Sequence, residues 1–380
     1  MQREESIRLQ PLQPSRLGYM VQLDSLRAVA VFSVMIEHFV PKKYLLGAVL
    51  PWGVLGVKFF FVLSGFLITG ILLRCRYLVE LKKQDAKFTL RQFYIRRFLR
   101  IVPIYYLTIA VTALVNIEPV RKTLFWNLTY TSNIYFTLKG EWQGSISHFW
   151  SLAVEEQFYL FWPLLVLFIP QKHLLKTIVF TIALGLLSRL ICSEFGLNIV
   201  VLQTMTFNSL DSLGMGALLA FYSQDYKRFK QFKSQLCNLC LWVSIPLFVS
   251  LQILRLFPTS ELSRASVVED TITAMLFTAL IGHAAYGFGG FVGTILELKP
   301  LVYLGKISYG IYVYHNFMNI ILLHPSVFRF LGLPYPNSEL MQIYFKVVAS
   351  VIIASLSWYV IEKPINNFKR FFEYKKSQVG

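Results

Sequence analysis

Residues 23–39 read LDSLRAVAVFSVMIEHF, an apolar run that contains the charged Arg27 and the titratable His38. In a helix, the eleven-residue step from Arg27 to His38 turns about 1100°, close to three full turns, and rises roughly 16 Å. Both side chains therefore lie on one face at two depths. Because an ionisable group that faces lipid is costly, this face is expected to line a protein interior or a water-filled path. Packing against a neighbouring helix explains the pattern equally well.

The rest of the chain has the composition of a membrane protein. Its 380 residues are 55% hydrophobic with a mean hydropathy of +0.54, which excludes an ordinary soluble protein. Apolar blocks long enough to span a bilayer predict an all-α, polytopic protein of the cell (inner or plasma) membrane, with about ten transmembrane helices. The expected spans lie near residues 24–40, 52–73, 101–117, 149–169, 177–192, 205–222, 237–256, 270–287, 300–323 and 340–360.

The distribution of charge predicts the orientation of the chain. Loops on the side of the two termini carry 24 Lys and Arg residues, and loops on the other side carry 7. By the positive-inside rule both termini are cytoplasmic. We expect a polar cytoplasmic tail at 1–20, a transmembrane domain at 21–365 and a basic cytoplasmic tail at 366–380. Because this clustering beside anionic lipid accounts for the net charge of +17, no nucleic acid partner is expected.

The most basic segment is the predicted inner loop 74–100, which continues into FYIRRFLRIVP at residues 93–103. Arg97 and Arg100 are one helical step apart, so they can face one anion together. This spacing favours an anionic cytoplasmic ligand. A charge cluster that orients the following helix and binds lipid headgroups explains the same residues.

A second informative stretch reads HFWSLAVEEQFY at residues 148–159. His148 and Glu155 are seven residues apart and therefore share a helical face at the outer end of a predicted span. His38 also lies toward the outer end of its span. We therefore expect His38, His148 and Glu155 to converge at one depth on the extracytoplasmic side, with Arg27 deeper.

Several small or ionisable residues within the predicted spans are candidates for lining the site or for structure. Asp211 is expected either to pair with an arginine or to line the site, and Glu362 is expected to form a salt bridge near the arginine-rich loop. A lone CxxC at 237–240 lacks a second ligand pair, so no metal site is expected. The full set is Ser64, Gly65, Asp211, His315 and Glu362.

Six stretches together resemble the membrane-bound acyltransferase family 3, the integral-membrane O-acyltransferases of cell-surface glycans. The resemblance covers nearly the whole chain. The stretches are Arg27-x10-His38, FFFVLSGF at 59–66, Arg97-x2-Arg100, HFWSLAVEEQFY at 148–159, ISYGIYVYH at 307–315 and YVIEKP at 359–364.

This resemblance implies transfer of an acyl group, usually acetyl from cytoplasmic acetyl-CoA, to a sugar hydroxyl on the other side of the bilayer. The acceptor would be a cell-surface polysaccharide, such as lipopolysaccharide, or a lipid-linked glycan. Some members carry a soluble hydrolase-like domain after the membrane part. We expect no such fused domain here, because only sixteen residues follow Pro364, so a separate partner is possible.

The residues named above suit this chemistry. A hydroxyl that attacks a thioester needs a base, and imidazole titrates near neutral pH. We expect His38 to be the base, with Glu155 and His148 as further catalytic residues. A covalent acyl-histidine intermediate remains open. The residues expected to bind the anionic parts of acetyl-CoA are Arg27, Arg97 and Arg100.

A transporter or flippase for a glycan or a lipid-linked substrate is the alternative function, because intramembrane charges also line translocation paths. The sequence shows no internal repeat of the kind found in many transporters, which weakens this alternative.

Overall fold

The computed structural model describes residues 19–374 except 225–229, 232–234, 236, 255–261 and 323. Within these ranges every regular element is a helix, which confirms the all-α expectation. Parts of the expected tails 1–20 and 366–380, and the end of the expected span 237–256, lie outside the described residues.

The first half of the chain contains α1 (Val21–Phe39), α2 (Leu45–Ala48), α3 (Trp52–Glu80), α4 (Ala86–Leu114), α5 (Leu124–Leu128), α6 (Ser132–Lys139), η1 (Gly144–Ile146), α7 (Phe149–Phe168) and α8 (Gln171–Glu194). The second half contains α9 (Ile199–Thr204), η2 (Phe207–Ser209), α10 (Leu210–Tyr222), α12 (Asn238–Leu254), α13 (Leu262–Tyr286), α14 (Gly290–Leu296), α15 (Lys299–Lys306), α16 (Ser308–Tyr314), η4 (His315–Phe317), α17 (Met318–Ile321), α18 (Pro325–Phe330), α19 (Glu339–Ser357), η5 (Trp358–Glu362), α20 (Lys363–Asn367) and η6 (Phe368–Phe372).

Six helices of the described chain are long and apolar enough to cross a membrane. They are α3, α4, α7, α8, the Val267–Tyr286 part of α13, and the run Glu339–Phe372 from α19 to η6. Of two further apolar helices, α10 has 13 residues, fewer than the expected span, and the described part of α12 has 17. The helical membrane architecture is thus confirmed, and the count of ten remains a prediction.

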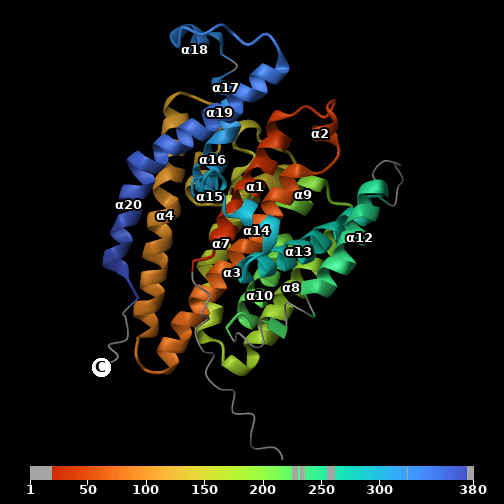
Figure 1. Cartoon of the computed structure of the whole chain (residues 1–380), viewed down its shortest axis with the longest axis vertical. Helices are drawn as coiled ribbons and strands as arrows, with labels where there is room; N and C mark the ends of the chain where they lie inside the picture. The colour runs from red at the N-terminus through yellow and green to blue at the C-terminus, as the bar shows by residue number, and fades with distance from the viewer. Residues whose placement is uncertain are drawn as a thin grey trace, which may run out of the picture.

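The two ends of the bundle carry different parts of the chain. The turn between α3 and α4 and the last described residues lie at one end, and α2 and α18 lie at the opposite end (Figure 1). The basic loop and the C-terminal segment therefore share one end, as the charge pattern requires. Which end faces the cytoplasm remains a prediction.

The segment 300–323, expected as one span, is divided into α15, α16, η4 and α17. An added Cβ at Gly305 would lie 1.7 Å from the carbonyl oxygen of Asp24, so the backbones of α15 and α1 are in contact. The helix is interrupted at Ile307, directly after this contact, so the segment does not form a single straight helix.

Small residues allow α3 and α10 to pack closely. A Cβ added to Gly65 would lie 2.0 Å from the carbonyl oxygen of Leu213. A Cβ added to Gly216 would lie 1.9 Å from the carbonyl oxygen of Val62. Small residues commonly permit such an approach between membrane helices. Gly65 therefore serves helix packing.

A buried network of charges joins α3, α8, α10 and α13. Arg189 contacts Asp211 at 2.5 Å and Asp270 at 3.3 Å, and Lys58 contacts Asp270 at 2.7 Å. Thr271 donates a hydrogen bond of 2.8 Å to Asp211 Oδ2. Two cations and two carboxylates thus balance one another inside the bundle. Asp211 therefore has the first of its two expected roles, pairing with an arginine.

Candidate active site

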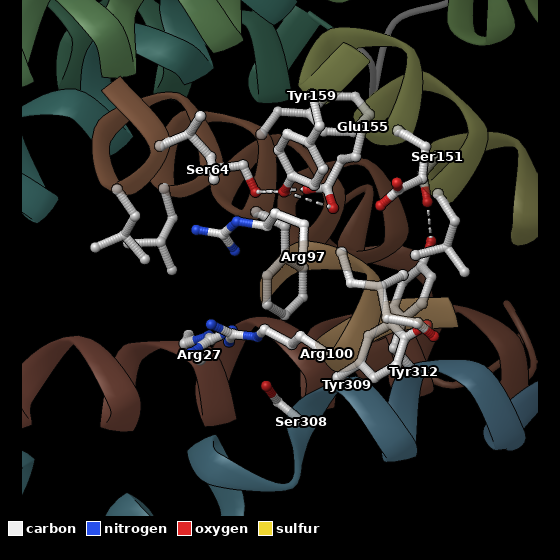
Figure 2. A pocket seen from close by; sticks show the side chains of 18 of the residues that line it. Arg27, Ser64, Arg97, Arg100, Ser151, Glu155, Tyr159, Ser308, Tyr309 and Tyr312 are labelled. Carbon is white, nitrogen blue, oxygen red and sulfur yellow. Dashed lines mark hydrogen bonds between the residues drawn. The ribbon is translucent and has the colours of Figure 1, made fainter. Parts of the chain in front are cut away.

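A cavity of about 80 Å³ lies between α1, α3, α4, α7 and α16. Figure 2 shows the side chains of Arg27 and Arg100 next to each other, with Arg97 above them. The three arginines that the sequence assigned to one anion therefore line one cavity, although Arg27 belongs to a different helix from the other two. The charged lining residues are Arg27, Arg97, Arg100, Glu155 and Glu156.

The arginines of this cavity are only weakly neutralised. Arg27 lies 3.6 Å from Asp24, and its buried Nε has no hydrogen-bond partner within the described residues. The guanidinium of Arg97 lies 5.6 Å from the ring centroid of Tyr159. In the described part of the chain, no carboxylate comes within 4.0 Å of Arg97 or Arg100. Guanidinium groups without a carboxylate partner are suited to bind an anionic ligand.

Glu155 belongs to this cavity. Ser64 Oγ donates a hydrogen bond of 2.8 Å to Glu155 Oε1. The hydroxyl of Tyr159 donates at 2.8 Å to Ser64 Oγ and lies 3.3 Å from Glu155 Oε2 (Figure 2). These bonds hold the carboxylate beside the arginines. Ser64 therefore lines the site, which is one of the two roles expected for it.

Three histidines form a second cluster. The ring of His315 lies with its centroid 5.0 Å from that of His38 and 4.9 Å from that of His148. His38 is half-buried, and the other two are buried. The structure thus brings His38 and His148 to a common neighbour, His315, and places Glu155 with the arginines instead.

In two of these histidines, a hydrogen bond to a backbone carbonyl oxygen determines which ring nitrogen carries a proton. His148 Nε2 lies 3.1 Å from the Val313 oxygen, and His315 Nδ1 lies 2.7 Å from the Tyr312 oxygen. Because a carbonyl oxygen only accepts, both nitrogens must carry a proton. His148 Nδ1 and His315 Nε2 are buried without a partner among the described residues. If both rings are neutral, these two nitrogens present free lone pairs.

Tyr312 lies next to both the cavity and the histidine cluster. It lines the cavity, and its ring centroid lies 5.6 Å from that of His315 and 5.7 Å from that of His148. Its hydroxyl is hydrogen-bonded to Ser151 Oγ (Figure 2) and also donates to the His148 carbonyl oxygen. Tyr312 therefore contacts both the arginine-lined cavity and the imidazoles.

Several polar residues that line the cavity had no role predicted from the sequence. Tyr159 and Ser151 lie within the HFWSLAVEEQFY stretch. The four-residue step from Glu155 to Tyr159 places both side chains on one face of a helix, and this spacing could have identified Tyr159 as a site residue. Glu156 Oε1 is buried without a partner in the described ranges. The lining residues that were missed are Ser151, Glu156, Tyr159, Ser308, Tyr309 and Tyr312.

Gly65, Asp211 and Glu362 belong neither to the cavity lining nor to the histidine cluster. Asp211 belongs to the charge network, and Glu362 is buried where it accepts a hydrogen bond of 3.1 Å from Ser357 Oγ. The salt bridge expected for Glu362 is not formed among the described residues, because its carboxylate turns toward Ser357 within the π-helical turn η5. Arg100 still lies within electrostatic range of Glu362.

Known proteins resemble this chain over most of its length. A sequence profile described as an acyltransferase domain matches residues 20–359. The chain is 31% identical over 400 residues to the peptidoglycan O-acetyltransferase OatA of Listeria monocytogenes, a match that covers 95% of this chain and 60% of that protein. It is 29% identical over 378 residues to the putative peptidoglycan O-acetyltransferase YrhL of Bacillus subtilis, covering 91% and 55%.

The O-acetyltransferase OatA of Staphylococcus aureus is 26% identical over 391 residues, covering 95% of this chain and 60% of that protein. The chain thus spans between 55% and 60% of the length of these relatives. No solved structure matches it significantly. The profile match includes the arginines, the histidines and the tyrosine next to both, so the chain belongs to the acyltransferase 3 family, as its sequence motifs predicted.

Proposed function

We propose that this chain is an integral-membrane O-acetyltransferase that moves an acetyl group from cytoplasmic acetyl-CoA to a hydroxyl of an extracytoplasmic glycan. One observation carries the proposal: an arginine-lined cavity and a histidine cluster both adjoin Tyr312. The relatives named as peptidoglycan O-acetyltransferases favour a cell-wall glycan, or its lipid-linked precursor, as the acceptor. They give no support to a transporter.

The donor would bind through its phosphate groups. Arg27, Arg97 and Arg100 present planar guanidinium forks, which bind phosphate oxygens in pairs. The arm that carries the thioester would then extend along the cavity toward Tyr312. The rise of roughly 16 Å from Arg27 to His38 leaves length for this arm. The hydrogen bonds from Ser64 and Tyr159 hold Glu155 beside the arginines, where it offsets part of their charge.

The transfer requires one base and one leaving group. As the acceptor oxygen attacks the thioester carbonyl carbon, His38 accepts the hydroxyl proton, a carbon–oxygen bond forms and the carbon–sulfur bond breaks. Coenzyme A leaves as a thiolate, which takes up a proton. His315 lies next to His38, and His148 lies next to His315, so these two histidines complete the cluster that contains the base. An acyl-histidine intermediate at His38 is the alternative route.

The proposal includes a topology. Both termini and the α3–α4 turn would be cytoplasmic, about ten helices would cross the plasma membrane, and α2 and α18 would face outward. Donor and acceptor would then approach the site from opposite faces. Transfer would be completed in the membrane domain or with a separate partner protein.

The experiment that tests this function uses purified protein in proteoliposomes with acetyl-labelled acetyl-CoA and a lipid-linked peptidoglycan precursor. We expect the label to appear in the glycan as an alkali-labile ester. Passage of the unlabelled glycan across the bilayer, with no ester formed, would identify a flippase and contradict the proposal.

Sidedness gives a separate prediction. Glu141 and Lys87 are both exposed, one in the segment before α7 and the other at the start of α4. After replacement of the four native cysteines, Glu141→Cys is expected to react with a membrane-impermeant thiol reagent in intact cells. Lys87→Cys is expected to react only after the cells are opened. The reverse labelling pattern would invert the topology and rule out a cytoplasmic donor at the arginines.

A further inference from the structure

The C-terminal segment of the described chain, from η5 to Tyr374, continues the helical run of α19 and lies alongside α4 (Figure 1). Arg96 of α4 fixes it there. Its Nη1 donates hydrogen bonds of 2.9 Å to the Lys369 carbonyl oxygen and 3.2 Å to that of Phe372, and its guanidinium lies 5.6 Å from the Tyr374 ring centroid. The segment is therefore packed against α4 at the level of the arginine pair, although its composition alone suggests a basic tail that extends toward lipid headgroups.

This packing brings a further cation to the arginine cluster. Lys369 is half-buried and hydrogen-bonds to Asn366 Oδ1. It lies within electrostatic range of Arg96, Arg97 and Arg100. Arg97 and Arg100 line the cavity, so Lys369 lies beside the same site.

The charge of this cluster is not balanced by close acids. Glu156 lies within electrostatic range of Arg97, and Glu362 within range of Arg100. However, no carboxylate of the described chain comes within 4.0 Å of any of the four cations. Like charges held close together repel one another, and the repulsion is stronger in a site of low dielectric than in water. An anion bound among the four cations would relieve it.

We propose that Lys369 is a donor-binding residue: the contacts of Arg96 with the Lys369 and Phe372 carbonyl oxygens hold it next to the cavity-lining Arg97 and Arg100, where it binds a phosphate group of a polyanionic ligand. The identification of this ligand as coenzyme A rests on the proposed function. Coenzyme A carries a diphosphate and a ribose phosphate, so it offers more negative charge than the three arginines of the cavity would neutralise. The arginines bind phosphate oxygens as forks, and the lysine adds a point charge. An anionic lipid headgroup has the same phosphate chemistry and is the other possible source.

The test measures binding without transfer. Full-length protein in phosphatidylcholine nanodiscs is titrated calorimetrically with coenzyme A, which lacks the acetyl group. We expect Lys369→Gln to weaken the affinity about tenfold, because a charge-assisted contact to phosphate is lost. Lys369→Arg is expected to stay within about threefold of wild type, because it keeps the charge. Pantetheine, which lacks phosphate, is expected to bind both proteins equally.

The matched control is Lys363→Gln, which removes the same charge from an exposed side chain of the same segment. It is expected to leave the affinity for coenzyme A within about twofold of wild type. An equal loss in Lys363→Gln and Lys369→Gln, or a loss for pantetheine as large as that for coenzyme A, would overturn the inference.

A second arm distinguishes the two sources of phosphate. Nanodiscs that contain phosphatidylglycerol are compared with pure phosphatidylcholine. If phosphatidylglycerol raises the unfolding temperature of wild type but not of Lys369→Gln, while coenzyme A affects neither, the site takes lipid and the assignment to the donor fails. If coenzyme A binding depends on Lys369 but no acetyl transfer occurs, the inference stands and the proposed function fails.

Discussion

Replacement of His38 by alanine is expected to reduce acetyl transfer by about 10²–10⁴-fold, the usual contribution of a positioned general acid or base. His38 is the half-buried member of the histidine cluster, and its ring centroid lies 5.0 Å from that of His315. The substitution removes the base without introducing a buried charge. Protein level, membrane insertion and coenzyme A affinity are therefore expected to remain near wild type. The measurement is the initial rate of ester formation in proteoliposomes.

The control for this prediction is His324→Ala, the same substitution at an exposed histidine directly before α18. It is expected to leave the rate unchanged. A His38→Ala protein that binds coenzyme A and transfers acetyl at the wild-type rate would remove His38 from the reaction. Mass spectrometry of wild type after donor is added without acceptor separates the two routes, since an acetylated His38 would show the covalent one.

Local periodicity was enough to predict part of the site. The rotation of the helix between Arg27 and His38 placed both on one face, and both side chains meet interior groups: Arg27 lines the cavity and His38 contacts His315. The step between Arg97 and Arg100 likewise predicted that both would reach the same space. Such inferences succeed because helical geometry relates residues within one helix whatever the rest of the fold does.

The same geometry shows why the predicted place of Glu155 was wrong. Seven residues return to the same face of a helix, but they also advance roughly 10 Å along its axis. His148 at the start of α7 therefore meets His315, whereas Glu155 reaches Ser64 and the arginines. A shared face does not imply a shared depth, and the depth of a group is decided by the partners it meets on other helices.

Contacts between distant segments account for the other differences. The position of Tyr312 next to both the cavity and the histidines depends on how α15 and α16 pack against α1, and hydropathy carries no information about that packing. The approach of Lys369 to α4 depends on backbone carbonyls that accept from Arg96, which the composition of the tail does not reveal. The motifs identified the participants, and only the fold showed which of them meet.

The buried charge network gives the largest expected effect on stability. Asp211 is fully buried, and Asp211→Asn would leave Arg189 without its closest carboxylate. Breaking one partner of a buried ion pair typically costs about 3–5 kcal/mol. We therefore expect Asp211→Asn to lower the unfolding temperature sharply, or to prevent folded protein from accumulating. The exposed pair Lys122–Glu118 provides the control, because Glu118→Gln is expected to leave the unfolding temperature near that of wild type.

A double substitution distinguishes a structural network from a functional one. Arg189→Met combined with Asp211→Leu removes both charges and fills the space with apolar side chains. A buried ion pair replaced in this way is often tolerated, so the double variant is expected to be more stable than Asp211→Asn. Asp270 keeps its contact with Lys58 in that variant. Because Asp211 does not line the arginine cavity, the folded double variant is expected to transfer acetyl at a rate near wild type. A double variant that is folded and binds coenzyme A but transfers no acetyl would show that the network takes part in the reaction, since lost packing would then no longer explain the defect.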